Sequence, residues 1–108
     1  MRDRVDEVFS ALADPNRRFL LETLAARADA TATELAAELP VTRQAVSKHL
    51  AALSDAGLVR SARAGRETRY RLTPEPLGEA VSWIERVGGA WDERLAALSR
   101  HLSGGGSG

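Results

Sequence analysis

The sequence contains no cysteine, which excludes disulfide bonds, thiolate metal sites and cysteine nucleophiles. No apolar run approaches the roughly 18 residues that a membrane-spanning helix needs, and the opening MRDRVDE lacks the apolar segment of a signal peptide. The sequence also shows no Ser/His/Asp set, paired-carboxylate signature or phosphate-cradling glycine loop. These absences predict a protein that is not an enzyme, and they are compatible with a cytoplasmic location.

The chain has no net charge, since 15 basic residues balance 15 acidic ones, but the charges are unevenly distributed. Residues 41–73 contain seven basic and two acidic side chains, a local net charge of +5, and the remainder carries −5. Such an asymmetry indicates one face suited to a polyanion.

The length and composition predict one small domain. The chain has 108 residues, of which 44% are hydrophobic and 28% charged, as in ordinary globular proteins. We place this domain at residues 1–102, and we expect the SGGGSG segment at 103–108 to be a flexible tail. A domain of this size buries a modest fraction of its surface, so an oligomer interface would help to stabilise it.

Helical spacing of apolar residues and recognisable helix ends predict four helices before residue 57. Asp14 before Pro15 is a typical helix start, Thr31 with Glu34 matches a capping box, and Thr42 is a third N-cap. Gly57 is the expected left-handed stop. The four predicted helices cover residues 3–13, 15–27, 32–39 and 42–56.

The apolar period then changes from about 3.6 to about 2. LVRSAR and ETRYRLT flank Ala64-Gly65-Arg66, which predicts a two-stranded hairpin with glycine at its turn. A helix over residues 77–102 follows, with one apolar stripe along it. These 26 residues would span roughly 39 Å, about the width of a small domain, so part of the stripe should have no core of its own to cover.

Two short helices separated by LPV, followed at once by a basic hairpin, predict a mainly α winged helix-turn-helix fold with five helices and a two-stranded wing. In such motifs the second helix enters the DNA major groove with its N-terminal end leading. On a helical wheel, polar side chains at this end of residues 42–56 lie opposite or beside the apolar line. The candidate DNA-reading residues are Thr42, Arg43, Gln44, Ser47 and Lys48.

Other basic and polar residues are candidates for the DNA backbone. Arg63, Arg66 and Arg69 lie on the predicted wing, and Thr31 and Thr33 begin the third helix, where backbone N–H groups bind phosphate. Two simpler interpretations remain open. Any amphipathic helix has a polar face, and exposed strands often carry charge that prevents aggregation.

Three stretches together resemble ArsR-type winged-helix transcriptional regulators: ALADPNRRFLLETL, ELAAELPVTRQAVSKHLAALSDAGLV and GRETRYRLTPEPL. The match covers nearly the whole chain from about residue 8. The resemblance implies a homodimeric repressor that binds palindromic double-stranded DNA operators, with the first and last helices pairing across a two-fold axis. The interface residues expected on these helices are Val5, Val8, Phe9, Leu12, Ile84, Val87, Trp91, Leu95 and Leu98.

Many members of this family release DNA when a metal or arsenical binds. The third helix, TATELAAEL, lacks the cysteines that would serve as ligands, and Asp92, Glu93 and His101 form a poor ligand set on the last helix. The tail WIERVGGAWDERLAALSRHL instead resembles a cysteine-free subgroup, so we predict neither a metal site nor a cofactor. Two alternatives remain: a protein-interaction module that uses the same face, and a sensor of an unidentified effector.

Overall fold

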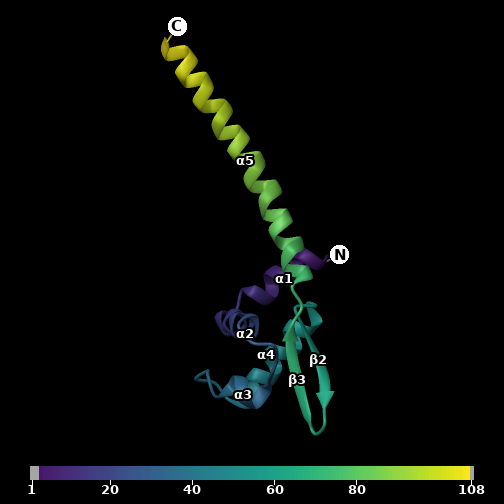
Figure 1. Ribbon diagram of the computed structural model, residues 1–108. Coiled ribbons are helices and arrows are strands. Elements are labelled where there is room, and N and C mark those ends of the chain that lie inside the picture. Colours follow the sequence, from purple (N-terminus) through teal and green to yellow (C-terminus); the bar gives the residue numbers. More distant parts are fainter. Residues whose placement is uncertain (1–2, 108) are drawn as a thin grey trace.

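The computed structural model describes the backbone of residues 3–107 and the side chains of residues 3–101 (Figure 1). The molecule measures 74 × 29 × 24 Å because its last helix extends alone from a body formed by the other elements. In chain order the elements are α1 (Arg4–Leu12), α2 (Pro15–Ala25), β1 (Ala30–Thr31), α3 (Ala32–Ala36), α4 (Arg43–Asp55), β2 (Val59–Ala64), β3 (Glu67–Leu72) and α5 (Glu75–Ser107).

Local sequence signals set the helix ends. The Asp14 carboxylate accepts a hydrogen bond from the N–H of Asn16 at 2.7 Å and so caps α2. At the end of α4, Gly57 has a φ of 76°, and the N–H of Leu58 donates to the Leu53 carbonyl at 2.9 Å. Because only glycine adopts this left-handed conformation easily, the predicted stop at residue 57 is confirmed.

The core lies where α1, α2, α3 and α4 meet the sheet. Each helix turns the apolar side of its 3.6-residue period inward, and the side chains at the centre are fully buried. This packing removes the apolar surface of the body from water, which is the main favourable term in folding. The largest fully buried aliphatic side chains are Val8, Leu20, Leu24, Leu35, Val46, Leu50, Leu53 and Leu58.

The sheet has three strands in the order β1-β3-β2, so a third strand joins the predicted two-stranded wing. β2 and β3 form the expected hairpin, which closes with Ala64 opposite Glu67 and with Gly65 at a φ of 66°. The third strand, β1, pairs Ala30 with Tyr70 and Thr31 with Arg69. Two residues are too few to show a period of two, so β1 could not be predicted from the spacing of apolar residues.

Among the described side chains of α5, those that pack on the body lie near the start of the helix. Phe9 of α1 meets Trp83 edge to face at 5.4 Å between ring centroids, and Arg4 pairs with Glu79 at 3.1 Å. We call residues 81–101 the arm, because every side chain there is exposed. In the described part of the chain, no helix is both long enough and apolar enough to cross a bilayer.

The helix continues to Ser107 and does not end at residue 102 as expected. The expectation rested on the linker-like composition of SGGGSG, yet the backbone of 103–107 continues the helix. Leu102, the last residue of the predicted stripe, lies outside the described side chains, and residue 108 lies outside the described backbone. With this boundary corrected, the five helices and the wing match the predicted fold class.

Candidate nucleic-acid interface

α4 presents a polar face at its N-terminal end. The Thr42 hydroxyl accepts a hydrogen bond from the N–H of Ala45 at 3.1 Å, which fixes the first turn. Val46 and Leu50 are fully buried one and two turns into the helix, so they anchor one face in the core. The predicted reading residues are all exposed, and they comprise Thr42, Arg43, Gln44, Ser47 and Lys48.

A side-chain hydrogen bond connects α4 to α2. Arg17 Nε donates a hydrogen bond to His49 Nδ1 at 3.4 Å, and Arg17 also donates to the Ser10 carbonyl at 3.4 Å. The neighbouring Arg18 donates to the carbonyl of Leu12. The sequence alone assigned no role to Arg17 or Arg18, because nothing in their spacing indicates that Arg17 has a partner 32 residues away. In the structure both guanidiniums are engaged within the protein.

A groove of about 540 Å³ separates α4 from the wing. It brings together four side chains that the sequence proposed separately, Arg43 and Ser47 from α4 and Arg63 and Arg66 from the wing. Thr33 also lines the groove, whereas Gln44 and Lys48 are exposed on α4 outside it. Within residues 3–101, none of the lining arginines forms an ion pair. These guanidiniums are therefore available to an anion.

The side of the groove formed by β3 was not predicted from the sequence. Thr68 and Tyr70 of β3 line it, and neither was among the predicted DNA contacts. The alternation of a strand gives a usable signal for Thr68 and Tyr70, which are two residues apart in β3 and so share one side of the chain. What the alternation does not show is that α3 and α4 lie across from this side.

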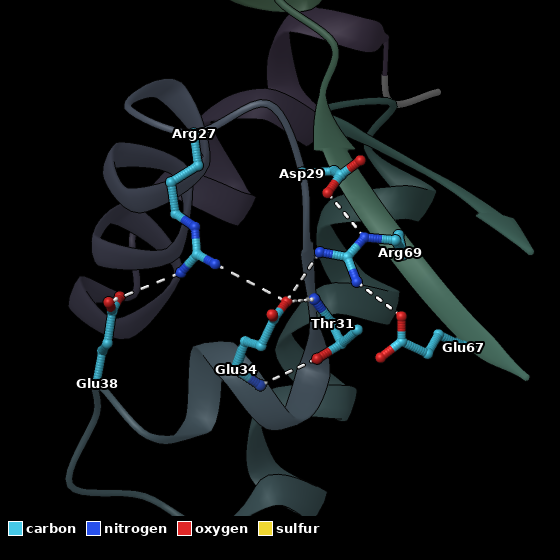
Figure 2. A network of polar contacts seen from close by, with 7 residues as sticks. All are labelled: Arg27, Asp29, Thr31, Glu34, Glu38, Glu67 and Arg69. Carbon is cyan, nitrogen blue, oxygen red and sulfur yellow. Dashed lines mark hydrogen bonds and ion pairs between the residues drawn. The ribbon is translucent and has the colours of Figure 1, made fainter. Parts of the chain in front are cut away.

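Arg69 is not presented to solvent as a phosphate contact would require. Its side chain is 25% exposed, and its guanidinium lies between the carboxylates of Asp29, Glu34 and Glu67 (Figure 2). The assignment of Arg69 to the DNA backbone is therefore corrected: its donors already bind these three carboxylates. The pairing of Thr31 with Arg69 places this side chain beside the start of α3, which the wing sequence alone does not reveal.

Thr31 is also engaged within the protein. It is 9% exposed, its N–H donates to Glu34 Oε1 at 2.8 Å, and its hydroxyl accepts from the Glu34 N–H at 3.1 Å. The bond from the Thr31 N–H, together with the charges of Arg69 and Arg27, lowers the pKa of Glu34. The predicted capping box is confirmed, and it occupies the groups that Thr31 would have offered to phosphate.

The predicted interface helices divide into a buried part and an exposed part. Val8 is fully buried in the core of its own protomer, so its assignment to an interface between protomers is wrong. Apolar residues recur at helical spacing on both the inward and the outward side of α1. Spacing alone therefore did not distinguish a core residue from an interface residue. Val5, Phe9 and Leu12 are half-buried. The exposed apolar side chains of α5 are Val81, Trp83, Ile84, Val87, Trp91, Leu95 and Leu98.

Comparisons with known proteins identify the family. A helix-turn-helix domain model matches residues 12–62. The regulator YuzN of Bacillus subtilis, named an uncharacterized HTH-type transcriptional regulator, is 40% identical over 92 residues, which are 79% of this chain and 100% of YuzN. An ArsR-like transcriptional regulator from Rhodococcus sp. RHA1 is 44% identical and superposes with a TM-score of 0.78 over 90% of this chain and 91% of that one.

The chain belongs to the ArsR-type family of winged helix-turn-helix transcriptional regulators. The helix-turn-helix match covers α2, α3 and α4, and α3 and α4 contribute Thr33, Glu34, Arg43 and Ser47 to the groove. The solution structure of Mb0332 from Mycobacterium bovis, described as a homodimeric winged helix-turn-helix DNA-binding domain, is 28% identical. It superposes with a TM-score of 0.65 over 81% of this chain and 80% of that one. Among the described side chains of this ArsR-type regulator, no three His, Asp or Glu residues form a potential metal site.

Proposed function

We propose that this ArsR-type regulator binds a palindromic double-stranded DNA operator as a homodimer and thereby represses transcription. The observation that carries the proposal is the groove, which sets the exposed start of α4 beside two unpaired wing arginines. DNA binding needs both parts, because base edges are read in the major groove while basic side chains hold the adjacent phosphates. Such a regulator acts where the DNA is, which we take to be the cytoplasm.

The start of α4 supplies the base-reading side chains. The side-chain amide of Gln44 can accept a hydrogen bond from adenine N6 and donate one to adenine N7, and Arg43 or Lys48 can donate to guanine. The half-buried Ala45 and Ala52 flank this face and allow the helix to approach another surface closely. Asp55 lies at the far end of α4, so its charge is distant from a phosphate that approaches the start.

The wing supplies sequence-independent contacts. Arg63 and Arg66 lie at the turn end of the hairpin, where each can neutralise a phosphate and release a counterion. Ser47 and Thr33 add hydroxyl donors to the same groove. Because Arg69 and Thr31 are already engaged, we leave both out of the proposed contact set.

A second copy is the proposed partner of the arm. Apolar side chains in the arm are about half exposed, for example Trp91 at 57% and Leu98 at 55%. A continuous apolar face of this kind is typical of an interface rather than of a free surface. Pairing through α5 and the Phe9–Trp83 cluster would set two α4 helices about one DNA turn, roughly 34 Å, apart on half-sites related by a dyad.

A gel-shift experiment tests the DNA-binding claim. Fragments of the source genome are selected for binding, and the DNA upstream of the protein's own gene is tested at two salt concentrations. We expect a shifted band whose affinity falls steeply as salt rises. The absence of any shift at low salt would contradict the proposal and would favour the protein-interaction module. Release of bound DNA by an added small molecule would identify the protein as a sensor as well.

A further inference from the structure

We infer that Arg69 is a positioning residue of the DNA groove, which binds the Glu67 and Glu34 carboxylates and so keeps the wing arginines available to phosphate. The inference rests on the proposed function, because it assumes that DNA occupies the groove. It assigns Arg69 an indirect role, in which this side chain acts on DNA binding through Glu67 without touching DNA.

The contacts of Arg69 use all three nitrogens of its guanidinium. Nε donates to Asp29 at 2.8 Å, Nη1 to Glu67 at 2.8 Å and Nη2 to Glu34 at 3.1 Å (Figure 2). These bonds join the segment before β1, the first turn of α3 and the first residue of β3. A planar guanidinium can do this because its donors point in fixed, different directions, whereas a lysine offers a single point charge.

The carboxylates of Glu34 and Glu67 need such a partner because both residues line the groove. A phosphate in the groove would be repelled by an unpaired carboxylate. A free carboxylate would also compete with phosphate for the guanidiniums of Arg63 and Arg66, which line the same groove. Glu67 belongs to the wing itself, since it directly follows Arg66 in the chain and closes the hairpin opposite Ala64.

The two carboxylates differ in how much they depend on Arg69. Glu34 also accepts from the Thr31 N–H at 2.8 Å and lies 3.8 Å from Arg27, so it keeps partners if Arg69 is removed. For Glu67, Arg69 is the sole ion-pair partner within residues 3–101. Loss of the Arg69 charge should therefore release Glu67 first.

The charge of Arg69 is itself secured by its surroundings. The hydrogen bond to Asp29 raises the pKa of Arg69 above its already high value. The hydrogen bond to Glu67 and the nearby charge of Glu34 act in the same direction. The guanidinium therefore stays protonated wherever the protein is folded, and Glu67 has a permanent cationic partner.

The test is a double-mutant cycle on the selected operator, with Arg69→Gln, Glu67→Gln and the combined variant. We expect Arg69→Gln to weaken binding roughly tenfold, the effect of losing one charge-assisted contact, and to lower the salt slope by about one. Glu67→Gln alone should change little. In the combined variant, affinity and salt slope should return close to those of the unchanged protein, because no carboxylate remains to occupy a wing arginine.

Matched controls separate this role from others. Arg71→Gln removes the same charge from an exposed position on the same strand, and adding Glu67→Gln to it should leave binding unchanged. Arg69→Lys keeps the charge but not the three directed donors, so its affinity should lie between those of the unchanged protein and Arg69→Gln. Thermal unfolding of each variant shows whether the fold is kept.

The possible outcomes are distinct. If Glu67→Gln fails to restore binding to a folded Arg69→Gln protein, then Arg69 acts by direct contact or by general stability and the inference is overturned. Equal affinity of Arg69→Gln and the unchanged protein would also overturn it. If the unchanged protein binds no DNA at low salt, the proposed function fails first.

Discussion

The body and the arm are built from the same kind of amphipathic helix, but they treat their apolar residues in opposite ways. In the body, Leu50 and Leu53 of α4 are fully buried, whereas Leu95 and Leu98 of the arm are about half exposed. A helix in water gains most of its stability from packing its apolar face. The body satisfies this requirement within one chain, whereas the arm leaves its apolar face exposed, and we propose that a second copy covers it.

The difference assigns separate tasks to the two regions. The body carries the groove, and its core fixes the position of each side chain that we propose contacts DNA. The arm holds none of these side chains and instead offers a surface through which two bodies can be held at a set distance. Changes in the arm should therefore affect DNA binding through assembly, and changes in the body should affect it through folding or contact.

The largest effect is expected from charges placed in the arm. Trp91→Glu combined with Leu95→Glu should give a folded monomer in sedimentation velocity, because a buried carboxylate in an apolar interface is costly. Operator affinity should fall by about a hundredfold or more, since one bound half-site no longer brings in the second. Glu93→Gln, an exposed change in the same stretch of α5, is the control. A dimeric or fully active double variant would contradict the assignment of the arm.

Truncation of a core side chain in the body should lower the free energy of unfolding more than truncation of an exposed side chain in the arm. Leu53→Ala should lower the free energy of unfolding by about 2–5 kcal/mol, because it leaves a cavity at a fully buried site. In the monomeric variant, Leu98→Ala should cost less than about 0.5 kcal/mol, as exposed substitutions do. Urea denaturation measures both. Equal costs would show that the arm packs within its own protomer.

Truncation of a reading residue should leave folding and assembly intact. Gln44→Ala should cost about 1–3 kcal/mol of operator binding and relax the preference at one base pair, because an amide that bonds a base edge is lost. Binding to a set of single-base operator variants measures this effect. Ser54→Ala, at the exposed far end of α4, should behave like the unchanged protein. An unaltered base preference in the Gln44 variant would remove this residue from the reading set.

The smallest effect is expected at the wing. Arg66→Ala should weaken binding to all sequences alike and lower the salt slope by about one, because one phosphate contact is lost. Titrations at several salt concentrations on operator and unrelated DNA measure the slope. Arg60→Ala, near the base of the hairpin, should leave the slope unchanged. A change in base preference at Arg66, or an equal effect at Arg60, would argue against the assigned role of the wing tip.

Features that depend on neighbouring residues could be predicted from the sequence. The cap at Thr42, the stop at Gly57 and the polar start of α4 all follow from residues within one or two helical turns. The hairpin followed from Gly65 between two alternating segments. For the same reason, the exposed set from Thr42 to Lys48 could be named before its surroundings were known.

Features that depend on distant pairing could not be predicted. Arg69 bonds residues 35 and 40 positions away, and alternation in a strand says nothing about what lies opposite. β1 is a strand only because it pairs with β3. Val8 and Phe9 both have apolar neighbours at helical spacing, yet one is buried within the protomer and the other lies at its edge beside Trp83.

The central claim is that two arms hold two reading helices at a fixed separation on DNA. The most direct measurement compares the affinity of the unchanged protein for its operator with that for an operator lengthened between half-sites by about five base pairs, half a helical turn. We expect two protomers on the operator and a sharp loss of affinity for the lengthened DNA, because its half-sites lie on opposite faces of the double helix. Equal affinity for both DNAs, or one protomer bound to each, would contradict it.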